Sequence, residues 1–152
     1  MAAPAADLAL RQAIELLFFA YRDFTGDADT VLAGYGFGRA HHRVIYFVAR
    51  RPGITVGELL AILEITKQSL ARVLGQLMRE GFVVQRTDVA DRRRRRLYLT
   101  PAAEALERTL TERQSARLAA AWTSAGDAAA SGFRAVLRAM IDPEDRSRFA
   151  GP

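Results

Sequence analysis

The sequence predicts a mainly helical α+β fold with one small β-hairpin. Apolar residues recur at helical spacing over most of the 152 residues, and half of the residues are hydrophobic, which is enough for a real core. Two short β-prone segments, 82–84 and 97–99, flank a run of five arginines. We therefore expect six helices and a hairpin in one domain.

The spacing of apolar residues near the N-terminus predicts a long helix that is apolar around its circumference. Such a helix must be buried on more than one face. Its apolar positions are Leu10, Ile14, Leu16, Leu17, Phe18, Phe19, Tyr21 and Phe24. Three glycines at 34, 36 and 38 mark a loop, and a second helix follows until Arg51-Pro52-Gly53 stops it. The stripe of that second helix is His41, Val44, Ile45 and Val48.

Residues 55–81 have the pattern of a helix-turn-helix. Thr55 and Glu58 form a capping box at the start of a short helix, and residues 63–65 make the turn. Thr66 is a natural N-cap for the next helix, and Gly81 ends that helix as a C′ glycine. The buried stripe of the second helix is predicted to be Leu70, Val73, Leu74 and Leu77.

The outward face of the second helix carries residues suited to DNA. Glutamine suits the edge of adenine and arginine suits guanine, whereas serine and lysine can hold phosphate. Taken alone, these polar residues are better explained as a solvated helix face, because helix-turn-helix patterns are common by chance. The neighbouring hairpin reverses that preference and favours DNA. The predicted DNA-contacting residues of this helix are Thr66, Lys67, Gln68, Ser69, Arg72, Gln76 and Arg79.

The arginine run occupies residues 92–96, directly after Asp91. Such a run is usually a disordered tail, because like charges repel and cannot be buried. Between two β-prone segments it is better interpreted as the exposed tip of a hairpin. Thr100 and Pro101 then predict the N-cap and first turn of another helix. A last helix is expected around the stripe Phe133, Val136, Leu137, Met140 and Ile141.

The positive charge is concentrated around these two motifs. Residues 50–100 hold 11 Lys and Arg against 5 Asp and Glu, whereas the rest of the chain holds 11 against 12. Phosphate neutralisation with release of counterions needs a concentrated patch of this kind. The coincidence of patch and motif predicts double-stranded DNA as the partner.

Several classes of function are disfavoured. With no cysteine, the chain has no disulfide, thiol redox sensor or thiolate metal site. The N-terminus lacks the order of a signal peptide and no apolar run is long enough for a membrane span, so we expect a cytoplasmic protein. Two adjacent histidines without a phosphate loop or paired carboxylates argue against an enzyme. We predict no metal and no cofactor.

Residues 38–104 resemble the MarR family of bacterial winged-helix regulators, named for control of multiple antibiotic resistance. In that family an Asp-x-Arg pair in the wing places an arginine in the minor groove, which maps onto Asp91 and Arg93. Narrow minor grooves also attract arginine electrostatically. Arg94 to Arg96 extend the run beyond the family's usual pattern, and Ala103 stands where the family often has glycine. The motifs that carry the resemblance are Pro52-Gly53-Ile54-Thr55, Thr66-Lys67-Gln68-Ser69, Gly81-Phe82-Val83, Asp91-Arg92-Arg93 and Leu97-Tyr98-Leu99-Thr100.

The resemblance implies a winged helix-turn-helix lobe over residues 38–100 and dimerisation helices over 7–34 and 101–148. A symmetric dimer implies a pseudo-palindromic operator. The resemblance to the MarR family also implies repression that is relieved by a small aromatic or anionic effector. The wing contacts expected are Asp91, Arg92, Arg93, Arg94 and Arg95, and the residues that would line an effector cleft are Phe18, Tyr21, Arg22, His41, His42 and Tyr46.

The alternative is an architectural DNA binder that ignores sequence, which a five-arginine wing would suit. The ratio of specific to random affinity separates the two. For a regulator it should be on the order of 10³ or more at physiological salt. The capped helix with Gln68 and Arg72 favours base reading.

Overall fold

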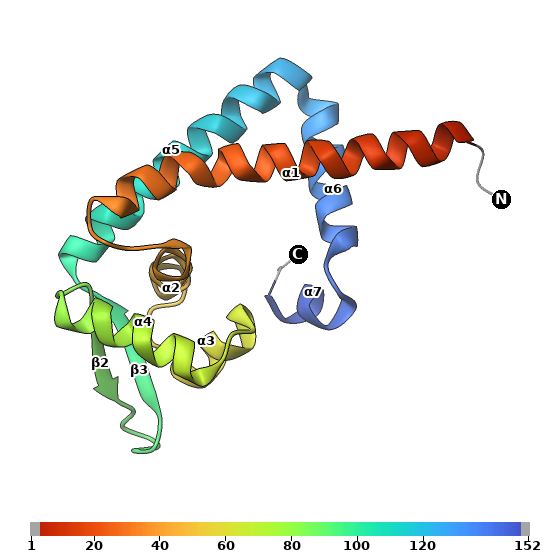
Figure 1. The fold of residues 1–152 in the computed structure, drawn as a ribbon. Helices are drawn as coiled ribbons and strands as arrows, with labels where there is room; N and C mark the ends of the chain where they lie inside the picture. Colours follow the sequence, from red (N-terminus) through yellow and green to blue (C-terminus); the bar gives the residue numbers. More distant parts are fainter. Residues whose placement is uncertain (1–3, 150–152) are drawn as a thin grey trace.

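The computed structural model describes residues 4–149, and within that range the chain forms seven helices and one three-stranded sheet (Figure 1). The helices are α1 (Pro4–Ala33), α2 (Arg39–Arg50), α3 (Val56–Leu63), α4 (Lys67–Arg79), α5 (Pro101–Ala125), α6 (Asp127–Met140) and α7 (Pro143–Phe149). The strands are β1 (Ile54–Thr55), β2 (Val83–Thr87) and β3 (Arg95–Leu99).

Helices α2, α3 and α4 pack with the three-stranded sheet to form a lobe, and α1 and α5 meet this lobe at one end only (Figure 1). The hydrophobic core lies in this lobe and includes the fully buried Leu59, Leu70 and Leu77. The end of α1 and the start of α5 complete that core with Ala28, Leu32, Ala103, Leu106 and Leu110.

The helix boundaries predicted in the lobe are confirmed by their caps. The Glu58 amide donates to the Thr55 hydroxyl at 3.2 Å, and the Glu58 carboxylate accepts from the Thr55 amide at 2.8 Å. Thr66 caps α4 and Thr100 caps α5 through the same kind of hydroxyl contact. Gly81 takes a φ of +78°, the left-handed conformation expected of a C′ glycine.

Two elements differ from the sequence prediction. The predicted hairpin is a three-stranded antiparallel sheet of order β1-β3-β2, because Ile54 and Thr55 pair with Leu97 and Arg96. A seventh helix, α7, follows the six that were predicted. A two-residue strand and a seven-residue helix are too short for hydrophobic periodicity to reveal them.

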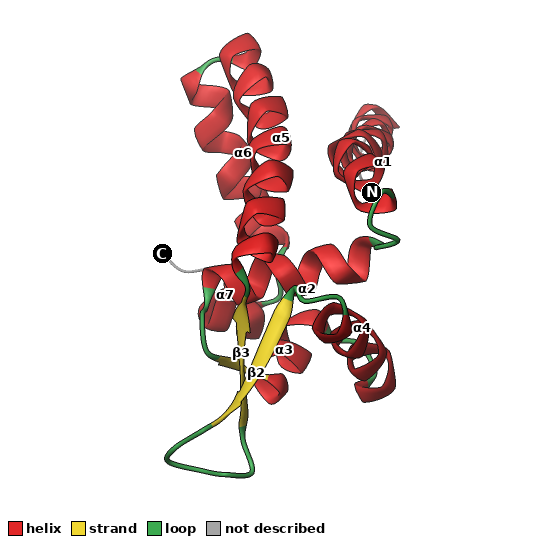
Figure 2. Ribbon diagram, turned by 90° about the vertical axis from the view of Figure 1, so that its left-hand side faces the viewer, coloured by secondary structure: helices red, strands yellow, loops and turns green. Residues whose placement is uncertain are grey.

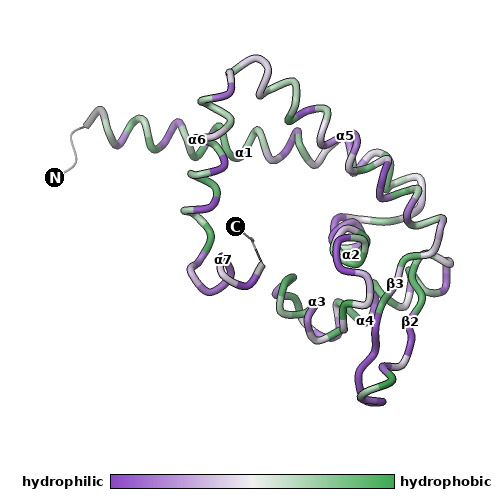
Figure 3. Tube along the Cα trace, turned by 180° about the vertical axis from the view of Figure 1, so that it is seen from behind, coloured by the Kyte–Doolittle hydropathy of each residue, from purple (hydrophilic) through white to green (hydrophobic). Residues whose placement is uncertain are grey.

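The helices outside the lobe expose their apolar residues. Leu10 is 64% exposed, Ile14 is 69% exposed and α6 has no buried residue. Hydrophobic segments recur along α1 and α6 well away from the lobe (Figure 3). Burial of α1 on more than one face is therefore not achieved within a single chain. No helix among residues 4–149 combines the length and hydropathy needed to cross a membrane.

Candidate nucleic-acid interface

Helix α4 presents a polar face to solvent and buries the opposite one. Its stripe of Leu70, Val73, Leu74 and Leu77 is buried as predicted. The exposed positions include Lys67, Gln68, Ala71, Arg72 and Arg79. The helix is held at its N-terminus by Thr66, whose hydroxyl accepts from the Ser69 amide at 3.1 Å. A capped start fixes the first turn, so these side chains project from a rigid element.

Gly75 keeps the middle of that face low. A Cβ built on Gly75 would lie 3.1 Å from Nη1 of Arg79, so the guanidinium of Arg79 extends over the glycine. Glycine inside a helix costs about 1 kcal/mol relative to alanine. Because Gly75 has no side chain, this part of α4 could approach the floor of a DNA groove closely.

Gln76 lies at the edge of the predicted face of α4, and its side chain is bonded to other protein groups. Its Oε1 lies 2.8 Å from Nε2 of His41 on α2, and its Nε2 donates to Glu80 at 3.1 Å. Because Nδ1 of His41 accepts from the Gly38 amide at 3.1 Å, Nε2 of His41 carries the hydrogen and donates to Gln76. Gln76 therefore ties α4 to α2 in this structure, in place of extending the outward face.

The wing, residues 83–99, consists of β2, β3 and the loop between them, and it projects away from α5 and α6 (Figure 2). Asp91 accepts from the Arg93 backbone amide at 3.0 Å and from Nε of Arg93 at 3.4 Å. The Arg93 side chain is nevertheless 93% exposed. Asp91 thus fixes the base of an arginine whose guanidinium stays available to a ligand.

The other arginines of the run have unequal surroundings. Arg92 and Arg94 are exposed in the loop, and Nη1 of Arg95 donates to the hydroxyl of Thr87 on the neighbouring strand at 2.9 Å. Alternation along β3 sends Arg95 and Arg96 to opposite faces of the sheet. The run is therefore not a uniform block of charge.

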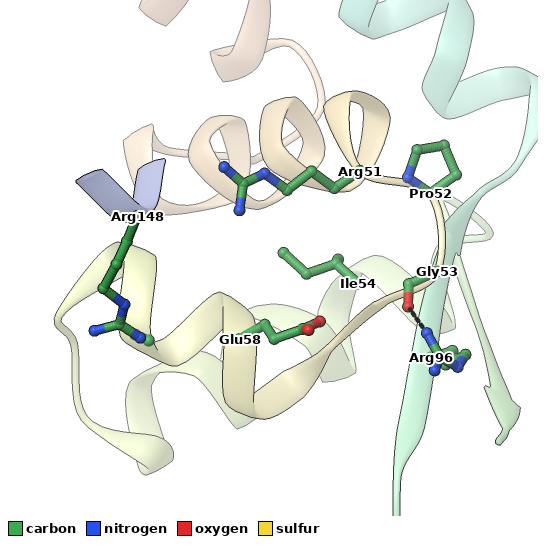
Figure 4. Close-up of a pocket in the computed structure, with 8 residues that line it drawn as sticks. Arg51, Pro52, Gly53, Ile54, Glu58, Arg96 and Arg148 are labelled. Carbon is green, nitrogen blue, oxygen red and sulfur yellow. Dashed lines mark hydrogen bonds between the residues drawn. The ribbon is translucent and has the colours of Figure 1, made fainter. Parts of the chain in front are cut away.

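Arg96 and Asp88 form an ion pair, which was not predicted from the sequence, where β2 and β3 meet the wing loop. Their Nη2 and Oδ2 atoms lie 2.8 Å apart, and the Asp88 side chain is only 8% exposed. The Ala90 amide, and after it the Arg96 guanidinium, lower the pKa of Asp88 below its ordinary value. Nη1 of Arg96 also donates to the carbonyl of Gly53 at 2.9 Å (Figure 4). The sequence does place Asp88 eight residues before Arg96. That spacing alone does not predict an ion pair, because the two side chains meet only through the conformation of the loop between them.

A cavity of about 450 Å³ lies beside this contact, between the end of α2, α3 and α7 (Figure 4). Arg51, Arg96 and Arg148 line it together with Glu58, whose pKa is lowered chiefly by the Thr55 backbone amide. Over residues 4–149 no three His, Asp or Glu side chains are grouped as metal ligands would be.

The residues suggested for an effector cleft are dispersed. His41 contacts α4, His42 is half-buried in α2 and Tyr46 packs edge-on against Phe47. Phe18 is 64% exposed, and the Arg22 guanidinium lies over the ring of Phe19.

Of the six residues, only Tyr21 lines a cavity of about 690 Å³ formed by α1, α5 and α6. Trp122 and Phe133 supply further aromatic surface to this cavity, and neither was predicted there. Their apolar spacing fits simple packing as well as a cavity wall, so this cavity could not be predicted from the sequence.

Comparison with known proteins places this architecture in a family. The family model for the MarR family matches residues 35–94. The HTH-type transcriptional regulator PetP of Rhodobacter capsulatus is 49% identical over 143 residues, which cover 94% of this chain and 86% of PetP. A crystal structure of a MarR family transcription regulator superposes with a TM-score of 0.77 at 23% identity, covering 90% of each chain. Streptococcus pneumoniae FabT, solved in complex with DNA, gives a TM-score of 0.75 at 17% identity over 84% of this chain and 92% of FabT. The chain therefore belongs to the MarR family.

Proposed function

We propose that this protein is a transcriptional regulator that binds double-stranded DNA sequence-specifically in the cytoplasm. The observation that carries the proposal is the juxtaposition, on one lobe, of the exposed polar face of α4 and the exposed Asp91–Arg93 pair. The similarity to PetP, which is described as a transcriptional regulator, and to FabT, solved on DNA, supports the same conclusion.

The two surfaces suit different grooves. Helix α4 has the exposed Gln68 and Arg72 for base edges in the major groove, and Gly75 leaves room for close approach. The wing offers Arg93 to a narrow minor groove, where the negative potential is strongest. Lys67 and the wing arginines Arg92, Arg94 and Arg95 would bind phosphates and so fix the register of the lobe on the duplex.

The functional unit of this proposal is a homodimer. The exposed apolar faces of α1 and α6 form a surface that one chain leaves uncovered. A second copy has the same surface and can cover it with two-fold symmetry. Two lobes would then meet two half-sites of a pseudo-palindromic operator, roughly one helical turn apart.

Repression is the mode that the family resemblance favours, with release by a small aromatic or anionic effector. Tyr21 and Trp122 give the cavity at α1, α5 and α6 aromatic surface, while Arg117 in its lining is paired with Asp27 and Asp23 adds a carboxylate. This mainly apolar lining fits an aromatic effector better than a sugar or a metal ion.

A selection of bound duplexes from a random DNA pool tests the proposed function. We expect a palindromic consensus, bound on the order of 10³-fold more tightly than random duplex at physiological salt. Bound pools without a consensus, or equal affinity for selected and random duplexes, would instead make the protein an architectural DNA binder.

A further inference from the structure

Arg96 differs from the other four arginines of the run in what it contacts. Its guanidinium donates Nη2 to Asp88 at 2.8 Å and Nη1 to the Gly53 carbonyl at 2.9 Å. Its side chain is 38% exposed, against 93% for Arg93. The planar fork of Arg96 is therefore already engaged on both sides by the protein, whereas the Arg93 guanidinium projects into solvent.

Asp88, on one side of this contact, organises the wing loop. Its Oδ1 accepts from the Ala90 amide at 3.0 Å, while its own amide donates to the Arg94 carbonyl at 3.0 Å. The first of these bonds turns the chain as it leaves β2, and the second closes the loop before β3. Because Asp88 holds both ends of the loop, whatever fixes Asp88 also fixes the position of Arg93.

Gly53, on the other side, begins the helix-turn-helix. It stands directly before β1 and α3, and its amide donates to the Leu97 carbonyl at 2.9 Å. Its φ is +85°, and a Cβ added there would lie 3.0 Å from the Tyr98 hydroxyl, so the main chain of Gly53 is closely confined. The Gly53 carbonyl is thus a fixed point of the helix-turn-helix. Figure 4 shows Arg96 reaching it from β3.

We propose that Arg96 is a positioning residue and not a DNA contact. By joining Asp88 to Gly53, Arg96 holds the wing loop at a set place relative to the helix-turn-helix, so that Arg93 and α4 can engage one duplex together. The inference rests on the proposed DNA binding. It assigns the fifth arginine of the run a role distinct from that of its neighbours.

Affinity measured against salt separates positioning from phosphate contact. The probe is a duplex selected from the random pool, and the variants are Arg96→Met, which keeps the aliphatic stem, and Asp88→Asn. We expect each to weaken binding by about tenfold while leaving the dependence of log K on log salt unchanged, since no phosphate contact is lost. The matched control is Arg95→Met, one position away on β3; it should flatten that slope by about one unit if it loses a phosphate contact. A comparable flattening in Arg96→Met would overturn the proposal.

A double-mutant cycle with Arg93→Ala separates positioning from general destabilisation. If Arg96 acts by placing Arg93, adding Arg96→Met to Arg93→Ala should cost little further affinity. If instead the losses of affinity in the two single variants multiply in the double variant, the proposal is contradicted.

The variant Arg96→Lys keeps the positive charge but lacks the planar guanidinium. A single ammonium cannot bond to Asp88 and Gly53 in the same way, so Arg96→Lys should bind more tightly than Arg96→Met but more weakly than the wild type. Thermal unfolding of each variant shows whether the lobe remains folded.

Hydrogen exchange of the free protein tests the same contact without DNA. In Arg96→Met the amides of Asp88 and Ala90 should exchange faster, while amides in α4 keep their protection. Unchanged exchange at both wing amides would reject the positioning role. Failure of the wild-type protein to prefer the selected duplex would count against the proposed function instead, so the two failures are distinguishable.

Discussion

The lobe and the helices outside it contain similar amphipathic stripes but use them differently. In α4 the apolar stripe is buried within the chain, because Leu70 and Leu77 are fully buried in the core formed with α2, α3 and the sheet. In α6 a stripe with the same spacing stays exposed, and so do most large apolar residues in the first half of α1. The pattern of a helix therefore tells which face is apolar, but not which chain covers that face.

The division between the two regions runs through α1 itself. Thr25, Ala28 and Leu32 are buried at the lobe, whereas residues 6–23 are exposed throughout. The lobe half is also tied by ion pairs, with Asp27 joined to Arg117 of α5 and Asp29 to Arg39 of α2. A single rigid helix thus links the closed core to the open apolar face.

The largest effect is expected for truncation inside the lobe. Leu77→Ala should lower the free energy of unfolding by about 2–5 kcal/mol, because it removes a fully buried side chain and leaves a cavity. Leu8→Ala, at a position 57% exposed in α1, is the matched control and should cost much less at protein concentrations where the chain is monomeric. Urea unfolding at fixed protein concentration measures both. If both variants lose the same free energy of unfolding, burial within the chain does not determine how much each region contributes to stability.

A charge placed on the open face should act on assembly more than on folding. Leu17→Asp should raise the dimer dissociation constant by about 100-fold or more, since the proposed interface would bury an unpaired carboxylate. The helical content should persist, because Leu17 is 46% exposed within its own chain. Sedimentation velocity measures the dissociation constant. Val89→Asp, at a fully exposed apolar position in the wing, is the control and should stay dimeric. A dimeric Leu17→Asp protein would move the interface elsewhere.

A substitution on the exposed face of α4 should weaken sequence-specific DNA binding without affecting dimerisation. Arg72→Ala should cost about 1–3 kcal/mol of operator binding and relax the preference at one symmetric pair of positions. Its dimer dissociation constant should not change, because Arg72 is exposed on α4, and α4 lies away from α6 and from the N-terminal half of α1 (Figure 1). Binding to selected and random duplexes measures the effect. An equal loss on both would make Arg72 a phosphate contact.

The smallest effect is expected from His42 on α2. Burial lowers the pKa of His42 despite the nearby Asp29 and Glu107, which oppose the shift, while Arg43 adds to it. The folded state therefore holds fewer protons than the unfolded state below about pH 6.5, the ordinary pKa of histidine. Stability from the neutral ring should be complete above that pH and should decline as pH falls towards the folded-state pKa. Unfolding free energies of the wild type and His42→Gln, compared across this range, should converge at low pH; parallel curves would exclude the linkage.

The local elements of the lobe were predictable because their signals lie close together in the sequence. The capping box of Thr55 and Glu58, the N-cap at Thr66 and the left-handed Gly81 each depend on residues within a few positions. The wing was predictable for the same reason, since its two strands flank one loop.

What the sequence could not show depends on long-range pairing. Strand β1 exists because it pairs with β3, and Arg96 reaches Gly53 across 43 positions. The contact of Gln76 with His41, 35 positions away, also depends on how α2 and α4 pack. No periodicity encodes such contacts, because each depends on how separate elements pack.

The central place of β3 in the sheet has a consequence for the arginine run. Gain or loss of one arginine would change the net charge of the wing by one unit only. Because the five residues are identical and β3 is paired on both sides, β3 would keep its sequence and register, and the change would fall on the loop between β2 and β3. That loop is closed by the bond from the Asp88 amide to the Arg94 carbonyl, which a loop of another length would have to replace. The length of the arginine run, more than its charge, is therefore the constrained property of the wing.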